Sequence, residues 1–293
     1  MKKLFACLFS MFLFVQLLPQ ASNNQDIPFK MEELNATQFV SAVAKAGSVC
    51  VIPLGILEKH GLHLPIGTDL FQAREVAFMA AEKEYAVVFP PYFTGQIFEA
   101  KHQPGAIAYS TELMWKMLDE TCNELSRNGF KKIILLNGHG GNNSFLPFFC
   151  QSQLASPRDY IVVLFQPSPD EATQKAISAL KKTKNDGHAG EEETSMMYVI
   201  RPDLVHAEDA KKQTGEDQAR LKDLPFGYTG IWWYARFPNH YAGDGSQYNK
   251  ELGKLLLKSD ADQLVELISY LKKNNTIETL TNEFYNKATA PVK

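Results

Sequence analysis

Residues 48–69 read SVCVIPLGILEKHGLHLPIGTD, an apolar run followed at once by a cluster of polar side chains. The run from Val49 to Leu54 has no polar alternation, which predicts a strand that is buried on both faces. Glu58, His60 and Asp69 follow it, and carboxylate oxygens and imidazole nitrogens are ligands that suit zinc, manganese and iron(II). The cluster itself contains no cysteine, which argues against a structural zinc knot. The stretch therefore predicts a metal site at the end of a buried strand.

The spacing inside this cluster supports convergence on one site. Glu58 and His60 are two residues apart, so both side chains leave the same side of an extended backbone. Asp69 comes after a turn that contains Pro65 and Gly67, at the start of a helical segment. A carboxylate is also stabilised in a first helical turn for electrostatic reasons alone, so helix capping is the alternative role for Asp69.

The alternation of buried strand and helix continues along the chain. Strands are expected at 48–54, 86–89, 132–136 and 160–165, and helices at 70–83, 112–128, 144–154, 170–182 and 250–273. Apolar strands separated by helices of ten or more residues predict a mostly parallel sheet that is covered on both faces. The expected fold is a three-layer α/β/α arrangement. No repeat or linker divides the chain, so residues 22–293 are expected to form a single domain.

The first 21 residues are typical of a secretory signal peptide. The start carries two basic residues, Lys2 and Lys3, the next fifteen positions are almost wholly apolar, and small or polar residues follow Pro19. An uncleaved N-terminal anchor is the alternative, although the apolar stretch is short for a membrane span. We expect an exported protein, periplasmic or secreted, with no stable membrane insertion after cleavage.

Charge and cysteine content restrict the function classes further. The formal net charge is −3, and nothing in the pattern suggests a nucleic-acid partner. Beyond the signal peptide the cysteines are Cys50, Cys122 and Cys150, all in apolar stretches, as is typical of buried free thiols. One disulfide is compatible with this count, but the chain does not depend on a disulfide framework.

A second cluster, Asn137-Gly138-His139-Gly140-Gly141-Asn142, lies between a predicted strand and a predicted helix. Ligands gather at the carboxyl ends of strands in open α/β sheets, so His139 is a candidate metal ligand. A glycine-rich loop there could also cradle phosphate. This one lacks the lysine and the spacing of a P-loop, and the metal interpretation is favoured.

The third cluster is DGHAGEEETS at residues 186–195, a turn that enters another helix. Its candidate functional residues are His188 and Glu193. Glutamates in a first helical turn also complement the helix dipole, and this is the expected role of Glu191 and Glu192. Taken alone, His188 would be an ordinary surface histidine.

Together the three clusters resemble the creatininase family, also called creatinine amidohydrolases. The family's Glu-x-His-Gly, His-Leu-Pro and Gly-Thr-Asp elements are similar to residues 58–69. Its Asn-Gly-His-Gly-Gly-Asn and His-Ala-Gly-x-x-Glu-Thr-Ser motifs are similar to residues 137–142 and 188–195, and a weaker closing motif is similar to residues 243–253. The resemblance covers nearly the whole chain after the signal peptide. It implies a creatininase-like fold, hydrolysis of C–N bonds and a homo-oligomer, specifically a hexamer.

The resemblance also implies two divalent metal ions per chain: zinc, manganese or iron. It places Asp69 between the ions, His60 and His139 on one ion, and Glu58 on the other. Creatininase has a glutamate ligand two residues after the histidine of the second motif, where this chain has Gly141. The remaining carboxylate is therefore expected to be Glu193.

Such a pair of ions has a definite chemical use. It lowers the pKa of a bridging water and polarises a scissile carbonyl, so that hydroxide attack becomes feasible near neutral pH. His188 is the expected catalytic residue, carrying a proton to the departing nitrogen. His63 is expected to support the ligands rather than to bind metal.

The chain departs from creatininase itself at several places. Residues 184–187 lack the tryptophan and glutamate that line the creatinine pocket, so creatinine is not the expected substrate. Trp232 or Trp233 could supply a new pocket wall, although aromatic clusters more often belong to a core. The long polar segment 206–223 is a candidate lid or oligomer contact.

Three functions follow from this sequence. The leading one is an exported amidohydrolase that acts on a small-molecule amide, cyclic amide, formamide or peptide-like bond. A metal-dependent esterase or phosphoesterase is the second, since the same ions could serve it, but no arginine cluster for phosphate supports it. The third is a periplasmic ligand-binding protein that keeps the fold without turnover.

Overall fold

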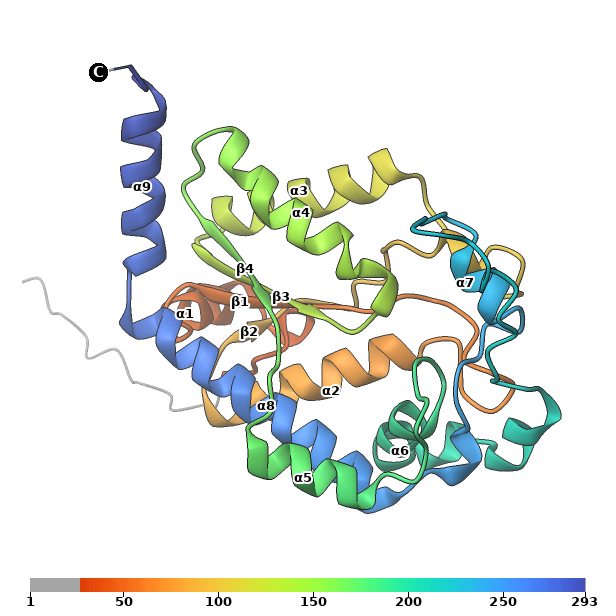
Figure 1. Ribbon diagram of the computed structural model, residues 1–293. Helices are drawn as coiled ribbons and strands as arrows, with labels where there is room; N and C mark the ends of the chain where they lie inside the picture. The colour runs from red at the N-terminus through yellow and green to blue at the C-terminus, as the bar shows by residue number, and fades with distance from the viewer. Residues whose placement is uncertain (1–26, 293) are drawn as a thin grey trace, which may run out of the picture.

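The computed structural model describes residues 27–292, and four parallel strands form its central sheet (Figure 1). The strand order is β2-β1-β3-β4, and the strands are β1 (Val49–Leu54), β2 (Val87–Val88), β3 (Lys132–Asn137) and β4 (Ile161–Phe165). The full length of β1 pairs with β3, from Val49 beside Lys132 to Leu54 beside Asn137. Both strands therefore end at the same edge of the sheet, which is where the first two motifs begin.

Helices cover both faces of this sheet. On one face lie α1 (Ala36–Lys45), α3 (Thr111–Arg127) and α4 (Phe145–Ser152). On the other lie α2 (Thr68–Lys83) and α8 (Lys250–Lys273). Figure 1 shows α3 and α4 above the sheet and α2 and α8 below it. The predicted α/β/α layering with a parallel sheet is confirmed.

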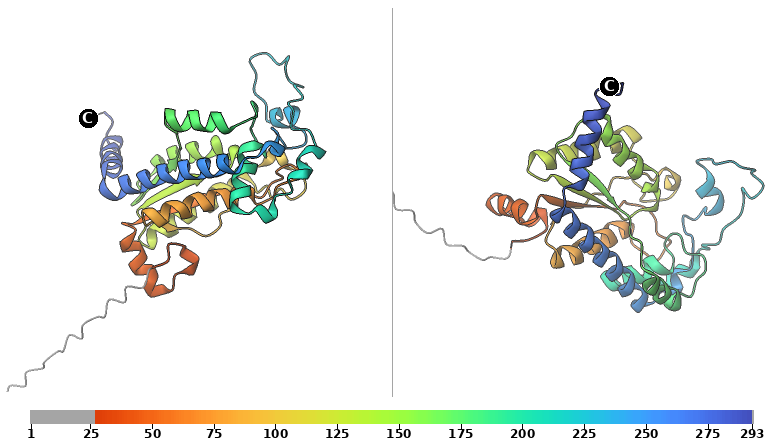
Figure 2. Two further views of the ribbon diagram at one scale, coloured as in Figure 1. Left: turned by 90° about the horizontal axis from the view of Figure 1, so that it is seen from below. Right: turned by 60° about the vertical axis from the view of Figure 1, so that its left-hand side comes forward.

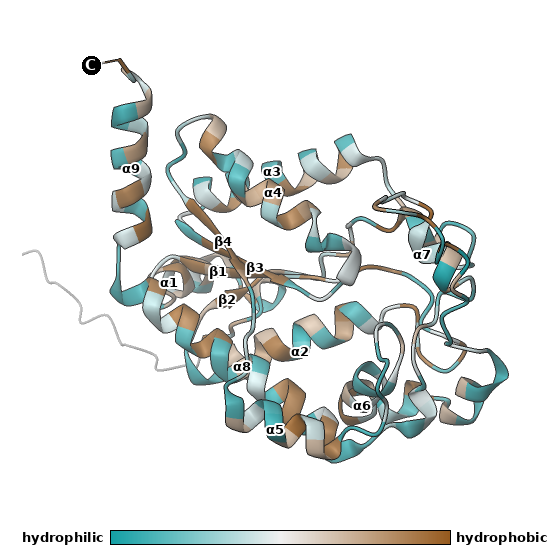
Figure 3. Cartoon of the chain, in the orientation of Figure 1, coloured by the Kyte–Doolittle hydropathy of each residue, from teal (hydrophilic) through white to brown (hydrophobic). Residues whose placement is uncertain are grey.

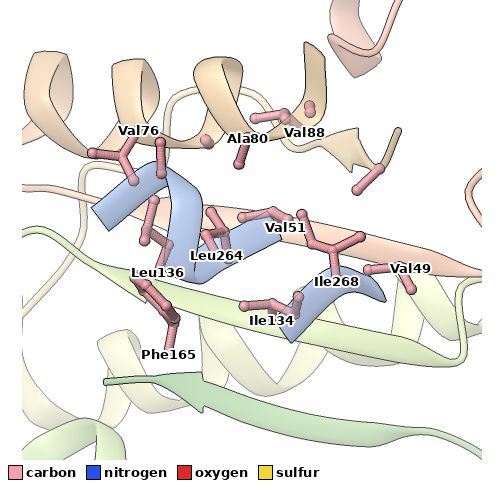
Figure 4. Close-up of a cluster of buried hydrophobic side chains, with 14 of the residues drawn as sticks. Val49, Val51, Val76, Ala80, Val88, Ile134, Leu136, Phe165, Leu264 and Ile268 are labelled. Carbon is pink, nitrogen blue, oxygen red and sulfur yellow. The ribbon is translucent and has the colours of Figure 1, made fainter. Parts of the chain in front are cut away.

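The strands divide their side chains between two buried clusters. Val49 and Val51 of β1 face α2 and α8, whereas Cys50 and Ile52 face α3 and α4. Figure 4 shows the first cluster, in which Leu264 lies near Val51. Both faces of the strand are fully buried, which explains its lack of polar alternation. In Figure 3 the strands are accordingly coloured as hydrophobic, whereas hydrophilic residues colour much of the outer helical surface.

The last motif-bearing helix, α6 (Glu191–Ile200), packs against α8 and lies near α5 (Glu171–Leu180) in Figure 1. The approach of α6 to α8 is close, because a Cβ added at Gly253 would lie 2.1 Å from the backbone oxygen of Ser195. This close contact explains why the Leu252-Gly253 pair has a glycine at its second position. It also fixes the first turn of α6, which carries Glu193, relative to the sheet.

Between α6 and α8 the chain is largely irregular. It contains α7 (Trp232–Arg236) and the 3₁₀ turns Pro202–Leu204, Ala207–Lys212 and Gly245–Gln247. This segment lies at the end of the molecule opposite the C-terminal α9 (Thr276–Ala288), and part of it protrudes in both views of Figure 2. The other 3₁₀ turns are Met31–Glu33, Phe98–Ala100, Gly140–Asn143 and Gln153–Ala155.

The expected elements and the observed ones agree closely, with three omissions. The helices α1, α7 and α9 were not expected, and the helix expected at 144–154 is α4 followed by a 3₁₀ turn. Cys50 and Cys122 are buried and Cys150 is half-buried, and all three are free, as predicted. The predicted signal peptide lies outside the described residues. Within residues 27–292, no helix combines the length and apolarity that a bilayer crossing requires.

Candidate metal centre

The six side chains predicted for the site converge at the carboxyl ends of β1 and β3. Three come from the loop after β1 and the start of α2, one from the loop after β3, and two from the turn before α6 and its first turn: Glu58, His60, Asp69, His139, His188 and Glu193. Five of them are buried, and Glu193 is the exception, with a side chain that is 26% exposed. The parallel strands thus bring together three segments that are far apart in the sequence.

Asp69 lies between two histidines. Its Oδ1 is 2.9 Å from His60 Nε2, and its Oδ2 is 3.1 Å from His139 Nδ1. The N-cap of α2 is Gly67, and no side chain caps this helix. The carboxylate of Asp69 therefore faces the site, and the alternative role as a simple helix cap is excluded.

The ring of His139 is oriented by a backbone carbonyl. Its Nε2 lies 2.7 Å from the oxygen of Gln96, and because a carbonyl only accepts, Nε2 is the nitrogen that carries the proton. In the neutral ring, Nδ1 then presents a lone pair to Glu58 Oε1 at 2.8 Å and to Asp69 Oδ2 at 3.1 Å. A lone pair that faces two carboxylate oxygens requires a positive charge between them, as in a metal site.

His60 has the same arrangement with its nitrogens exchanged. Its Nδ1 donates to the backbone oxygen of Glu58 at 3.2 Å, so the lone pair of the neutral ring is on Nε2. That nitrogen faces Asp69 Oδ1 at 2.9 Å and Glu193 Oε2 at 3.8 Å. Both rings are therefore held in the tautomer that a metal ligand needs.

The electrostatics of the site favour a cation. Burial alone would lower the pKa of His60, but Asp69 and Glu58 raise it to about 10, and the same carboxylates raise the pKa of His139 well above its usual value. Burial would raise the pKa of Glu58, yet the charges of His139 and His188 hold it well below its usual range. The carboxylates thus bind positive charge strongly, whether as protons on the rings or as a divalent ion.

Two buried oxygens support this conclusion. Glu58 Oε1 and Asp69 Oδ2 have no hydrogen-bond partner within the described residues, although His139 Nδ1 is close to both. The contacts of His139 Nδ1 with these two oxygens are short, but they do not have the geometry of hydrogen bonds. Possible ligand atoms of Glu58, His60 and Asp69 lie within 4.8 Å of one another, as do those of His60, His188 and Glu193. Imidazole nitrogens and carboxylate oxygens in this arrangement fit zinc, manganese or iron(II).

The three glutamates at the start of α6 have different roles. Glu191 accepts hydrogen bonds from the backbone N–H groups of Lys182 and Thr183, and Glu192 pairs with Lys181. Only Glu193 faces His60, and its Oε2 also accepts from Ala189 N at 2.6 Å. The choice of Glu193 among the three therefore agrees with the geometry, and its neighbours secure the preceding turn.

His188 and His63 lie around the ligand cluster. His188 donates from Nε2 to the backbone oxygen of Lys59 at 2.8 Å, which leaves Nδ1 4.0 Å from Glu193 Oε2. His63 Nε2 lies 3.0 Å from the backbone oxygen of Ala189 and from Thr194 Oγ1, and burial lowers the pKa of its imidazole to about 4. His63 thus joins the first motif to the turn that carries His188.

One residue of the site was missed in the sequence. His240, from the irregular segment before α8, hydrogen-bonds to Glu58 Oε2 through Nε2, and its ring lies 4.5 Å from that of His188. Burial lowers the pKa of His240 to about 4. Its neighbours Asn239 and Tyr241 form none of the recognised motifs, so no local signal in the sequence points to it.

Three cavities adjoin the site. One of about 300 Å³ is bordered by His139 and Glu193, and one of about 760 Å³ by Gly140 and Gly141. Trp232 lines this second cavity and also a third one of about 960 Å³, which Trp233 lines as well. Both tryptophans thus line cavities, and their role as a wall of the substrate pocket stays a prediction.

The chain matches the family model described as Creatininase: Creatinine amidohydrolase over residues 32–268. Its relatives include the creatinine amidohydrolase of Pseudomonas putida, 27% identical over 59% of this chain and 72% of that protein. The mycofactocin precursor peptide peptidase of Mycolicibacterium smegmatis is 32% identical over 53% of this chain and 59% of its own length. A 2-amino-5-formylamino-6-ribosylaminopyrimidin-4(3H)-one 5'-monophosphate deformylase from Methanothermus fervidus is 28% identical over 80% of this chain and 89% of its own length.

Solved structures agree on the fold. A creatininase superposes with a TM-score of 0.68 at 22% identity, covering 82% of this chain and 96% of the other. A putative creatinine amidohydrolase from Bacteroides fragilis gives a TM-score of 0.64 at 22% identity, over 78% and 91% of the two chains. Similar creatininase structures include one described as Zn-Zn type and one described with Mn. The chain is therefore a member of the creatininase family of amidohydrolases, as its three motifs predict.

Proposed function

We propose that this family member is a dinuclear-metal amidohydrolase that cleaves a small amide, cyclic amide or formamide other than creatinine. One observation carries the proposal. His60 and His139 are each locked by a backbone carbonyl in the tautomer that directs a lone pair at Asp69, and each faces a different oxygen of that carboxylate. A carboxylate that bridges two ions needs this geometry.

The distances favour a different division of ligands from the one that the resemblance implies. His139 lies against Glu58 and Asp69, and these three would hold one ion. His60 lies against Asp69 and is 3.8 Å from Glu193, and these three would hold the other. Asp69 remains the shared ligand, but His60 and His139 are assigned to different ions.

This arrangement suits hydrolysis of a C–N bond. Two divalent ions held here would activate a water and polarise a carbonyl. His188 has its Nε2 proton committed to the carbonyl of Lys59, so Nδ1 is the atom that takes up a proton and passes it to the departing nitrogen. Glu193 Oε2 lies 4.0 Å from that nitrogen.

The proposed substrate class rests on the cavities and on the relatives. The cavity of about 760 Å³ beside Gly140 and Gly141 has aromatic walls, including Trp232 and Tyr234, and also carries the polar side chains of Glu99 and Lys101. Such a mixture suits a small amide with an apolar part and a polar group. A relative that matches 80% of this chain is named as a deformylase, which makes formamides the first substrates to test.

Metal content is the direct test of the proposal. Purified protein should contain close to two zinc, manganese or iron ions per chain by inductively coupled plasma mass spectrometry. Glu58→Gln should lose one of them, because a neutral amide is a poor ligand at a site designed for positive charge. His206→Gln, at an exposed histidine outside the site, is the control and should keep both. A wild-type protein that binds no divalent metal would refute the dinuclear centre.

Measurements of turnover distinguish the role of His188, as proton carrier, from that of the metal ligands. His188→Ala should retain both ions and lose at least about 100-fold in kcat, in the usual range for a general acid–base group. The assay is a panel of amides, cyclic amides, formamides and esters with zinc or manganese added. Loss of an ion from His188→Ala would make His188 a ligand instead. Binding of a panel compound without turnover would favour the ligand-binding alternative.

Three further properties belong to the proposal. We infer that residues 1–21 direct export, that residues 22–293 act as one unit, and that the mature chain assembles into a homo-oligomer, a hexamer by resemblance. Cell fractionation with and without residues 1–21 tests the first of these. The oligomer is supported by apolar side chains of the irregular segment that are exposed in the single chain.

A further inference from the structure

His240 is the one buried histidine near the metal centre that none of the three motifs contains. It is 2% exposed and has a left-handed backbone conformation, with φ of 51°. Glu58, His188 and His240 have possible ligand atoms within 4.8 Å of one another, so distance alone would allow His240 to bind metal. The hydrogen bonds of its ring decide between a ligand and another role.

The two ring nitrogens of His240 have different partners. Trp233 Nε1 lies 2.8 Å from Nδ1, and because an indole N–H can only donate, Nδ1 must accept. The neutral ring therefore carries its proton on Nε2, which donates to Glu58 Oε2. This is the reverse of His60 and His139, which donate away from the centre and present a lone pair to it.

A role as metal ligand conflicts with this arrangement. If Nε2 bound an ion, the proton would move to Nδ1 and would point at the N–H group of Trp233, donor against donor. If Nδ1 bound an ion, the tryptophan would occupy its place. In either case the hydrogen bond between Trp233 and His240 would be lost. The two rings are packed together, with centroids 5.8 Å apart.

We propose that His240 is a positioning residue for Glu58 and that Trp233 sets the tautomer in which it acts. By donating to Oε2, His240 holds one oxygen of the carboxylate, so that Oε1 faces His139 at 2.8 Å. Oε1 is an oxygen that lacks a hydrogen-bond partner within residues 27–292 and is therefore free for an ion. This inference deepens the proposed function, because it assumes that Glu58 binds metal there.

The tautomer can be read directly, without any turnover. The full chain, labelled with ¹⁵N-histidine, would be studied by long-range ¹H–¹⁵N correlation NMR before and after addition of Zn²⁺, with single His→Gln variants used to assign the seven histidines. We expect the Nε2–H form of His240 in both states. An Nδ1–H form, or loss of the Nε2 proton when zinc binds, would make His240 a ligand and overturn the proposal.

Paired variants test the positioning role. Trp233→Phe removes the indole donor and should release the tautomer of His240, and His240→Leu removes the donor to Glu58. Each should raise the Zn²⁺ dissociation constant about 10- to 100-fold, the usual effect of losing a group that orients a ligand. Trp232→Phe is the matched control, since its indole makes no hydrogen bond in the described part of the chain, and it should leave the constant unchanged.

Rescue by a conservative variant separates positioning from packing. The amide of His240→Gln can still donate to Glu58 Oε2, so this variant should bind zinc nearly as tightly as the wild type, with the same number of ions, whereas His240→Leu should not. A His240→Gln variant that loses one ion, or a His240→Leu variant with unchanged affinity at an unchanged melting temperature, contradicts the proposal. If instead the proposed function fails, the chain will have no metal affinity, but NMR will still show the Nε2–H tautomer of His240.

Discussion

Gly141 is the residue on which the orientation of His139 depends. A Cβ at this position would lie 2.4 Å from His139 Nε2 and 2.5 Å from the oxygen of Gln96, the two atoms of the bond that fixes the ring. Gly141→Ala must therefore displace one of them, and we expect Zn²⁺ to bind about 10- to 100-fold more weakly. A competition titration with a chromophoric chelator measures this.

The adjacent Gly140 provides the control for this substitution. A Cβ there would meet no atom within 4 Å, and the backbone angle φ of this glycine is not positive. Gly140→Ala should thus bind zinc like the wild type. Equal losses in both variants would mean that the loop needs flexibility, rather than that Gly141 makes room for the carbonyl.

At the scale of single residues, the sequence revealed the side chains that recur in compact motifs and missed those that act from a distance. Glu58, His60 and Asp69 lie within twelve residues, and each has a type that suits a metal. His240 follows 180 residues after His60 and carries no motif, and the carbonyls of Gln96 and Lys59 have no side-chain signal at all. Their roles arise from tertiary contacts, which no local pattern encodes.

At the scale of elements, α8 contains an acid whose environment disfavours its charge. Burial raises the pKa of Asp260 to about 6, with a further contribution from the negative charge of Glu192. An acid with a raised pKa in the folded chain destabilises it when ionised, so the cost is absent below about pH 4 and complete above about pH 6. Asp260→Asn should raise the free energy of unfolding by about 1–2 kcal/mol at pH 7.5 and leave it unchanged at pH 4.

Urea unfolding of chelator-treated protein at the two pH values measures the effect of Asp260→Asn, since metal binding would otherwise add its own stabilisation. Asp262→Asn, two residues further along α8, is the control. Lys258 and Lys83 hold the pKa of Asp262 below its usual value, so its loss should cost a little stability at pH 7.5 and gain none. A gain from both variants would indicate a general effect of net charge.

The elements that the sequence predicted are those whose burial gives them a clear hydrophobic pattern. The strands β1 and β3 are buried on both faces, and α8 was predicted at its observed bounds, since one stripe of it packs on the sheet. The missed helices contribute little to the core: α1 buries only Ala42, α7 buries only Ala235, and α9 buries no residue. The capping box of Asn35 and Gln38 was a readable signal for α1.

At the scale of the molecule, convergence of the three motifs was predictable because parallel strands end at a common edge. The family model and the similar structures confirm the family and the fold. The segment between α6 and α8 was not predictable in shape, because it has little regular structure and its contacts are distant in sequence. For example, Lys59 Nζ donates hydrogen bonds to Gln213 Oε1 and to the backbone oxygen of Asn239.

That same segment carries strongly exposed apolar side chains near the cavities. Phe226 is fully exposed, Tyr228 is 82% exposed and Ile231 is 54% exposed. Exposed apolar groups that lie together mark protein contacts more often than free surface, and the family resemblance implies a hexamer. We therefore expect sedimentation velocity of the mature chain to show a homo-oligomer, and a double variant, Phe226→Asp with Tyr228→Asp, to shift it to smaller species.

The position of this segment gives the oligomer prediction a functional consequence. Tyr228 and Ile231 line the cavity of about 760 Å³, so a neighbouring copy that covers them would also close one side of that cavity. The double variant should then raise KM more than it lowers kcat, because the metal ligands are untouched. Val40→Asp, at a 72% exposed valine on α1, is the control and should alter neither quantity. A monomeric wild type, or a double variant with unchanged mass, would show that this surface is not the contact between copies.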